Sequence, residues 1–135
     1  MMIEEQLRKY SFFNYIGGFS IRKRSKSSVE TIQYTVQLLS NSGNLVLIFP
    51  QGEIQSMYRM NFEFESGLEH ILKRCTNLIH IVFLANLVDY FSNPKPVIYS
   101  YILEYSESDF SIATIQNKYN EFYKQCAEMQ IKIEK

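Results

Sequence analysis

The chain lacks the residue patterns on which several classes of protein depend. It has no tryptophan and only two cysteines and two histidines in 135 residues. Cys75 and Cys126 lie far apart and form no C-x-x-C pair, which argues against a disulfide scaffold or a zinc site and favours a reducing cytoplasm. Fourteen basic residues balance fourteen acidic ones, so the excess of cations typical of a general nucleic-acid binder is missing.

Long apolar runs are also missing. The longest, residues 45–49 and 78–85, are much shorter than the roughly 20 residues that a membrane-spanning helix needs. The first residues have neither the basic region nor the apolar core of a signal peptide. No G-x-S-x-G, G-x-x-x-x-G-K or G-x-G-x-x-G motif occurs, which argues against hydrolase and nucleotide-binding functions. We expect a cytoplasmic protein with no bound metal or cofactor.

The composition that is present suits one compact domain. Hydrophobic residues make up 46% of the chain, which is ample for a core. No internal repeat, low-complexity segment or Pro/Gly/Ser-rich linker divides the sequence, so we predict a single domain over residues 1–135.

Helical and strand-like patterns alternate along this domain. Capping boxes, in which Ser27 precedes Glu30 and Ser66 precedes Glu69, mark the starts of two helices, and Gly43 closes the first of these. The predicted helices are residues 3–10, 27–43, 66–75 and from about 111 onward, and the predicted strands are residues 19–22, 45–49, 78–84 and 97–105. The order predicts an α/β fold with a largely parallel or mixed central sheet flanked by helices.

The continuous apolar run of residues 45–49 is typical of a central strand covered on both faces. The last helix carries an apolar stripe that needs a packing partner, at spacings of three and four residues. Its members are Ile112, Ile115, Tyr119, Phe122, Cys126, Met129 and Ile133.

Two strand ends carry the candidate binding residues, because ligands of α/β folds gather where strands end. Residues 22–26 hold four cations beside the helix that begins at Ser27, which could bind a phosphate or simply form a solvated basic turn. At residues 49–52, Pro50 fixes one backbone angle and Gly52 frees another, so Gln51 is held rigidly. The alternative for this segment is an ordinary turn.

In order and spacing, these segments resemble the glycerolipid acyltransferase family, which acylates glycerol phosphate and lysophosphatidic acid. Residues 17–23, Gly-Gly-Phe-Ser-Ile-Arg-Lys, are similar to the family's G-x-x-F-I-D-R block, and residues 49–53, Phe-Pro-Gln-Gly-Glu, to its F-P-E-G-T block. Gly67 resembles the glycine that opens the family's next helix, and residues 78–85 lie where its apolar fourth block belongs. The resemblance covers most of the chain and implies an acyltransferase-like fold.

The resemblance also implies roles for individual residues. It places Arg22 at the second block's acidic position, Lys23 at its arginine position, and Gln51 where the third block has glutamate. Ile54 falls where the family often has a basic residue. The residues that would bind the acceptor phosphate are Arg22, Lys23, Arg24, Gln51 and Gly52, and those that would shape the loops are Gly18, Phe49 and Pro50.

The family's catalytic H-x-x-x-x-D motif is missing. Cys75 and Ala85 stand five residues after His70 and His80, so neither histidine opens that motif. We expect His70 to be solvated and His80 to be a hydrogen-bonded structural residue inside a buried strand. No catalytic residue is therefore assigned. The chain is expected to be the carboxyl-terminal part of a longer acyltransferase, truncated at its amino terminus and inactive alone.

The resemblance implies acyl-CoA or acyl carrier protein (acyl-ACP) as co-substrate and a phosphorylated lipid or glycerol as acceptor. It also implies peripheral association with the inner face of a membrane, where the aromatic segments 10–15 and 90–91 could rest at the lipid interface instead of in the core. The alternative function is a non-catalytic interaction module that forms a homodimer through the apolar stripe of the last helix.

Overall fold

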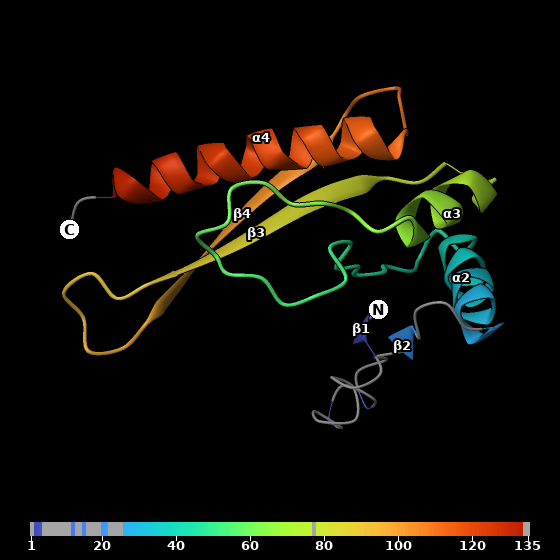
Figure 1. Ribbon diagram of the computed structural model, residues 1–135, viewed down its shortest axis with the longest axis horizontal. Coiled ribbons are helices and arrows are strands. Elements are labelled where there is room, and N and C mark those ends of the chain that lie inside the picture. The colour runs from blue at the N-terminus through green and yellow to red at the C-terminus, as the bar shows by residue number, and fades with distance from the viewer. Residues whose placement is uncertain are drawn as a thin grey trace. The chain divides into compact units, whose positions relative to one another are not determined.

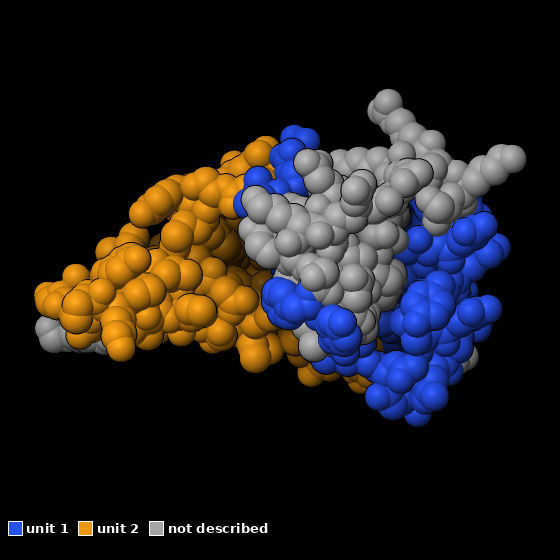
Figure 2. All heavy atoms as spheres, turned by 90° about the horizontal axis from the view of Figure 1, so that it is seen from below, with its two compact units in different colours: residues 1–54, 63–79 blue, residues 55–62, 80–135 orange. Residues whose placement is uncertain are grey.

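The computed structural model describes residues 2–3, 12, 15, 20–21, 26–76 and 78–133 of the chain. These fall into two compact units, shown in separate colours in Figure 2. Unit 1 comprises residues 1–54 and 63–79, and unit 2 comprises residues 55–62 and 80–135. The expectation of a single domain stays a prediction, and each unit is described by itself.

The described residues of unit 1 form two helices and a short strand pair. Strands β1 (Met2–Ile3) and β2 (Ser20–Ile21) pair in parallel. Helices α2 (Lys26–Leu39) and α3 (Gly67–Arg74) contact each other. Their buried side chains are Ile32 and Thr35, three residues apart in α2, and Ile71 in α3. Both helices were predicted from their apolar periodicity and both are confirmed, although α2 begins one residue before Ser27 and ends at Leu39 rather than at Gly43.

Unit 2 is a β-hairpin with a helix on one face, as Figure 1 shows. Strands β3 (Ile81–Asp89) and β4 (Val97–Tyr105) pair antiparallel, from Ile81 opposite Tyr105 to Asp89 opposite Val97. Burial alternates along β3, so that Phe83, Ala85 and Leu87 point to the covered face. Helix α4 (Ile112–Ile131) contacts both strands. The predicted strand at residues 97–105 and the predicted last helix are confirmed.

Aromatic rings form the centre of unit 2. Phe83 of β3 lies edge-on to Tyr119 of α4, with ring centres 5.4 Å apart, and Phe122 packs beside both. Phe62 meets Tyr123 edge-on with ring centres 4.8 Å apart, one of the two arrangements that aromatic quadrupoles favour. The apolar stripe of α4 therefore finds its partner within this unit.

Segment 55–62 joins unit 2 through hydrogen bonds to α4. The side chain of Asn120 accepts from the Phe62 amide at 2.8 Å and donates to the Phe62 carbonyl at 3.2 Å, as a neighbouring strand would. The hydroxyl of Tyr123 donates to the carbonyl of Met57. These bonds satisfy the backbone of a buried residue, because Phe62 is almost fully covered.

The α/β mixture is confirmed, whereas the predicted central sheet differs from what the structure describes. Within the described ranges the strands form two separate pairs, and the longer pair, β3 with β4, is antiparallel. Residues 45–49 adopt no regular secondary structure, and Leu45 is 94% exposed, so the prediction of a buried central strand there is wrong. An apolar run records a tendency to be buried, but a strand also requires a neighbour with which to form a hydrogen-bonded ladder.

Two local predictions need correction. The strand expected at residues 78–84 begins later and runs further, as β3. The capping box of α3 does not form, since Ser66 has helical backbone angles and its side chain makes no capping bond, while Glu69 pairs with Lys73 at 2.6 Å. A capping serine needs extended backbone angles to turn its oxygen toward the helix amides. The predicted helix at residues 3–10 lies outside the described residues, apart from Ile3 in β1.

Candidate functional site

The loop at residues 49–52 is the part of the predicted site that the structure describes. Its four residues close a turn in which the Gly52 amide donates to the Phe49 carbonyl at 3.2 Å. Gly52 has a φ of 66°, a left-handed angle that a residue with a β-carbon adopts only at a cost. Proline at the second position of such a turn already has the required φ. The loop is therefore fixed by its own sequence.

A hydrogen bond from outside the turn, which we call the strap, also holds this loop. The Pro50 carbonyl accepts a hydrogen bond of 2.8 Å from the amide of Glu65, just before α3. Segments 15 residues apart are thereby joined at the turn, both inside unit 1. The turn and the start of α3 form one local framework that positions Gln51.

The side chains of this turn are only partly covered. Pro50, Gln51 and Gly52 are half-buried, whereas Phe49 is 52% exposed and Ile54 is more exposed still. A half-buried amide side chain can both donate to a phosphate oxygen and accept from a hydroxyl. Gln51 thus has the chemistry of a ligand-contacting residue, held on a rigid turn.

The other predicted site residues cannot be added to this geometry. Gly18, Arg22, Lys23 and Arg24 lie outside the described residues. Their expected position opposite the 49–52 turn stays a prediction.

Gly67 begins α3, as the sequence indicated. A β-carbon placed on it would meet nothing within 4 Å, so no close contact requires glycine there. In the first turn that follows, the hydrogen bond from Lys73 and its positive charge lower the pKa of Glu69. The pair is exposed at the lysine and strengthens the helix rather than forming a reactive centre.

Neither histidine forms a catalytic pair. His70 is exposed on α3, as predicted. His80 is also exposed, so its expected burial is wrong, although its Nδ1 atom lies 3.2 Å from Oε1 of Glu104. It precedes β3 rather than lying inside the strand, because the strand begins at Ile81, three residues after the start of the apolar run.

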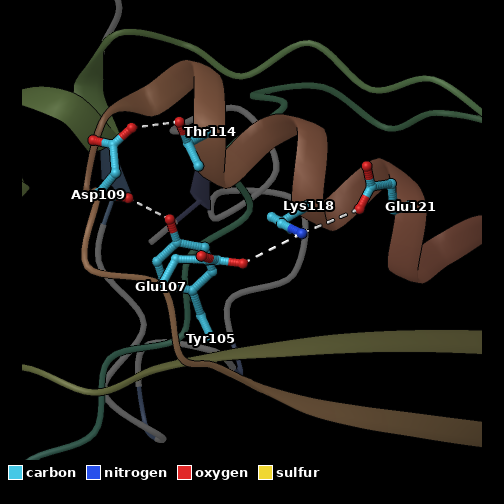
Figure 3. A network of polar contacts seen from close by, with 6 residues as sticks. All are labelled: Tyr105, Glu107, Asp109, Thr114, Lys118 and Glu121. Atoms are coloured by element: carbon cyan, nitrogen blue, oxygen red, sulfur yellow. Dashed lines mark hydrogen bonds and ion pairs between the residues drawn. The ribbon is translucent and has the colours of Figure 1, made fainter.

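Sequence reasoning missed a cluster of polar contacts at the start of α4, drawn in Figure 3. The Asp109 carboxylate accepts from the Thr114 hydroxyl at 2.5 Å and from the amide and hydroxyl of Ser111, both at 2.9 Å. The Tyr105 hydroxyl donates to the Asp109 carbonyl. The hydrogen bonds to the carboxylate, that from Thr114 foremost, lower the pKa of Asp109. An aspartate two residues before a capping serine was the available signal.

Further along α4, Lys118 lies between two carboxylates. Its Nζ atom is 3.3 Å from Glu107 and 3.5 Å from Glu121, and the hydrogen bond with Glu107 is the main reason that its pKa is raised. A groove of about 230 Å³ beside this triplet has Phe83, Leu103 and Phe122 in its lining. All three charges are exposed and paired with one another, so the cluster orders the β4–α4 connection without offering a free reactive group.

The described residues offer little other chemistry. Among them, no group of three His, Cys, Asp or Glu side chains could hold a metal ion. Burial raises the pKa of both thiols, Cys75 and Cys126, so they stay protonated at neutral pH and are poor nucleophiles. Burial also raises the pKa of Tyr119 to about 12, which keeps its hydroxyl neutral.

Comparison of the chain with known proteins found no similar protein. No family model matches the chain, and no match was found among curated proteins or solved structures. In the part of the chain that the structure describes, no helix is both long enough and apolar enough to cross a bilayer.

Proposed function

We propose that the chain is the acceptor-binding part of an acyltransferase that moves a fatty acyl group from acyl-CoA or acyl-ACP to a hydroxyl. The acceptor would be a glycerol phosphate or a lysophospholipid-like molecule. The observation that carries the proposal is the 49–52 turn, whose closing bond, strap to Glu65 and left-handed Gly52 hold a half-buried Gln51 in place. Its support from sequence is the order of the blocks at residues 17–23 and 49–53, which resembles that of glycerolipid acyltransferases.

The proposal divides acceptor binding between two segments. Arg22, Lys23 and Arg24 supply positive charge for the phosphate, and Gln51 contacts a polar oxygen of the acceptor. The phosphate would remain bound throughout the reaction, and its role is to hold the hydroxyl in position, since a correctly placed reactant lowers the barrier by removing orientational freedom.

The proposal assigns the proton transfer to a longer form of the protein. Acyl transfer to a hydroxyl needs a general base within reach of its proton, and a histidine oriented by a carboxylate is suited to this role. His70 and His80 open no H-x-x-x-x-D motif, and both are exposed. We therefore infer that residues 1–135 bind the acceptor but do not transfer the acyl group alone.

Binding can be tested by calorimetric titration of the whole chain with glycerol 3-phosphate. Replacing Lys23 and Arg24 by alanine is expected to weaken binding at least about tenfold, because each charge-assisted hydrogen bond contributes roughly 1.5–3 kcal/mol. The matched control removes two exposed cations of unit 2, Lys124 and Lys132. Equal weakening by the control pair would reduce the effect to general charge and contradict the proposal.

Catalysis is tested separately with acyl-CoA and glycerol 3-phosphate as substrates. An upstream-extended protein is expected to form the acylated product, whereas residues 1–135 form none. Turnover by residues 1–135 would contradict the assignment of the base to a longer form. Failure of the extended protein with every acyl donor and acceptor would contradict the proposed function itself.

The alternative of an interaction module built on α4 has less support. Ile115, Phe122 and Cys126, the centre of the apolar stripe, are buried within unit 2. Met129 remains 47% exposed near the end of the helix. A partner that binds α4 would therefore contact the margin of the stripe, and the surface left for it is small.

A further inference from the structure

The face of the β3–β4 hairpin that points away from α4 is apolar and exposed. We call it the outer face and define it by its five apolar side chains, which are between 38% and 70% exposed. They are Val82, Leu84, Val88, Ile98 and Ile102. Alternation along each strand places them opposite the buried Phe83, Ala85 and Leu87.

The strand register joins these side chains into one continuous surface. Leu84 lies directly opposite Ile102, and Val88 lies opposite Ile98. The exposed parts of the five side chains add to roughly 400–500 Å² of apolar surface, the size at which a patch on a soluble protein marks an interaction site.

The polar residues of the outer face are arranged so that they can be covered. Asn86 and Ser100 face each other between the apolar pairs, and the Ser100 hydroxyl donates to Oδ1 of Asn86 at 2.7 Å. This bond gives the Ser100 hydroxyl an acceptor and Asn86 Oδ1 a donor, so covering the pair does not leave these two atoms unpaired. Glu104, opposite Val82, leaves one negative charge at the base of the hairpin.

We propose that the outer face binds the outer face of a second copy of this chain, forming a dimer with two-fold symmetry. The two sheets would stack face to face with the tip of each hairpin over the base of the other. This arrangement brings Glu104 of each copy toward the partner's tip, where Lys95 is exposed. The charges at the two ends thus complement each other only when the two hairpins point in opposite directions.

The area and the charges favour a second copy over a lipid surface. Two outer faces together bury on the order of 1,000 Å² of apolar surface, close to the lower limit of specific interfaces once the polar rim is added. The acyl region of a bilayer would have to accept the Glu104 carboxylate, whose neighbour His80 is itself exposed, and would supply no cation for it. In the dimer, Glu104 gains a cation.

The first test measures the mass of the full chain by sedimentation over a range of concentrations. We expect two chains per particle at high concentration. The substitution Ile102→Lys should weaken association at least tenfold and shift the mass toward that of one chain. Ile131→Lys is the matched control, because Ile131 is an isoleucine of comparable exposure, 82%, at the end of α4. It should dimerise like the unchanged chain. Circular dichroism establishes that both variants fold.

A charge exchange tests the orientation of the two copies. Lys95→Glu and Glu104→Lys should each weaken the dimer, and the double variant should restore it. An apolar contact of any other geometry would not give this recovery.

Several results would overturn the proposal. A single-chain mass for the unchanged protein at all concentrations would do so, as would a dimer unaffected by Ile102→Lys. A protein that stays monomeric but floats with anionic vesicles, and loses that binding in Ile102→Lys, would assign the outer face to lipid instead.

Discussion

At the scale of single residues, Gly52 and Gly67 differ in how well each position would tolerate a side chain. Gly52 has a left-handed backbone angle, whereas Gly67 begins a helix in open space. Gly52→Ala should therefore lower the free energy of unfolding by about 1 kcal/mol. Gly52→Asn should cost less, because asparagine tolerates this angle better. Chemical denaturation gives both values, and Gly67→Ala, expected to be neutral or slightly stabilising, is the control.

Only part of this contrast could be predicted from the sequence. Pro50 and Gly52 predict a turn, because their backbone preferences are local and independent of the rest of the fold. The strap from Glu65 to Pro50 could not be predicted, since it joins segments whose approach depends on how the intervening loop folds.

Asp109 should give the start of α4 a specific dependence on pH. Its carboxyl has a lower pKa in the folded chain than in the unfolded chain, so its ionised form stabilises the fold above about pH 4 and this contribution is lost as the pH falls below that. Asp109→Asn should be less stable than the unchanged chain at neutral pH, and the difference should shrink on acidification.

The Thr114 hydroxyl is the main cause of the lowered pKa of Asp109. Thr114→Val should therefore raise that pKa, which carbon-detected NMR titration of the carboxyl measures directly. An unchanged pKa in Thr114→Val, or a stability difference in Asp109→Asn that persists at low pH, would show that these contacts do not favour the ionised carboxylate.

At the scale of elements, the two serines before α3 and α4 differ although their sequence signals are similar. The Ser111 side chain accepts a hydrogen bond of 3.3 Å from the Thr114 amide, while the Ser66 side chain caps nothing. Ser111→Ala should lower the free energy of unfolding by about 1 kcal/mol, the usual value of a helix cap. Ser66→Ala should change it by much less. Equal losses in urea denaturation would contradict the capping geometry.

Asn120 should be one of the main attachments of segment 55–62 to α4. Its side chain bonds both backbone groups of Phe62, so Asn120→Ala leaves a donor and an acceptor of a buried residue without that partner. We expect a loss of roughly 1–3 kcal/mol. Hydrogen exchange should become faster at the Phe62 amide. Unchanged protection of that amide would show that the segment is held by other contacts.

The elements also show which patterns can be interpreted from sequence. The helices and the strand β4 follow from local periodicity and turn residues. Residues 45–49 do not, because their apolar run favours burial in any conformation and their pairing depends on distant segments. The Asn120 contact has no sequence signal at all, since an asparagine on a half-buried helix position is equally compatible with solvation.

At the scale of the whole molecule, unit 2 takes segment 55–62 from between two parts of unit 1. The chain therefore passes between the units at segments that contain no Pro/Gly/Ser-rich linker. Sequence-based domain assignment looks for such linkers, so this organisation gave no signal. The proposed dimer likewise follows from strand register, which places scattered residues of β3 and β4 on one exposed face.

The turn at residues 49–52 is the segment that we propose binds a phosphorylated acceptor. The most direct test is an NMR titration of the whole chain with glycerol 3-phosphate and, in parallel, with glycerol. We predict that glycerol 3-phosphate shifts the amide signals of Gln51 and Gly52 in a saturable manner and that glycerol has a much weaker effect, because it lacks the phosphate. Signals of these two amides that do not move, or that move equally with both compounds, would contradict the account.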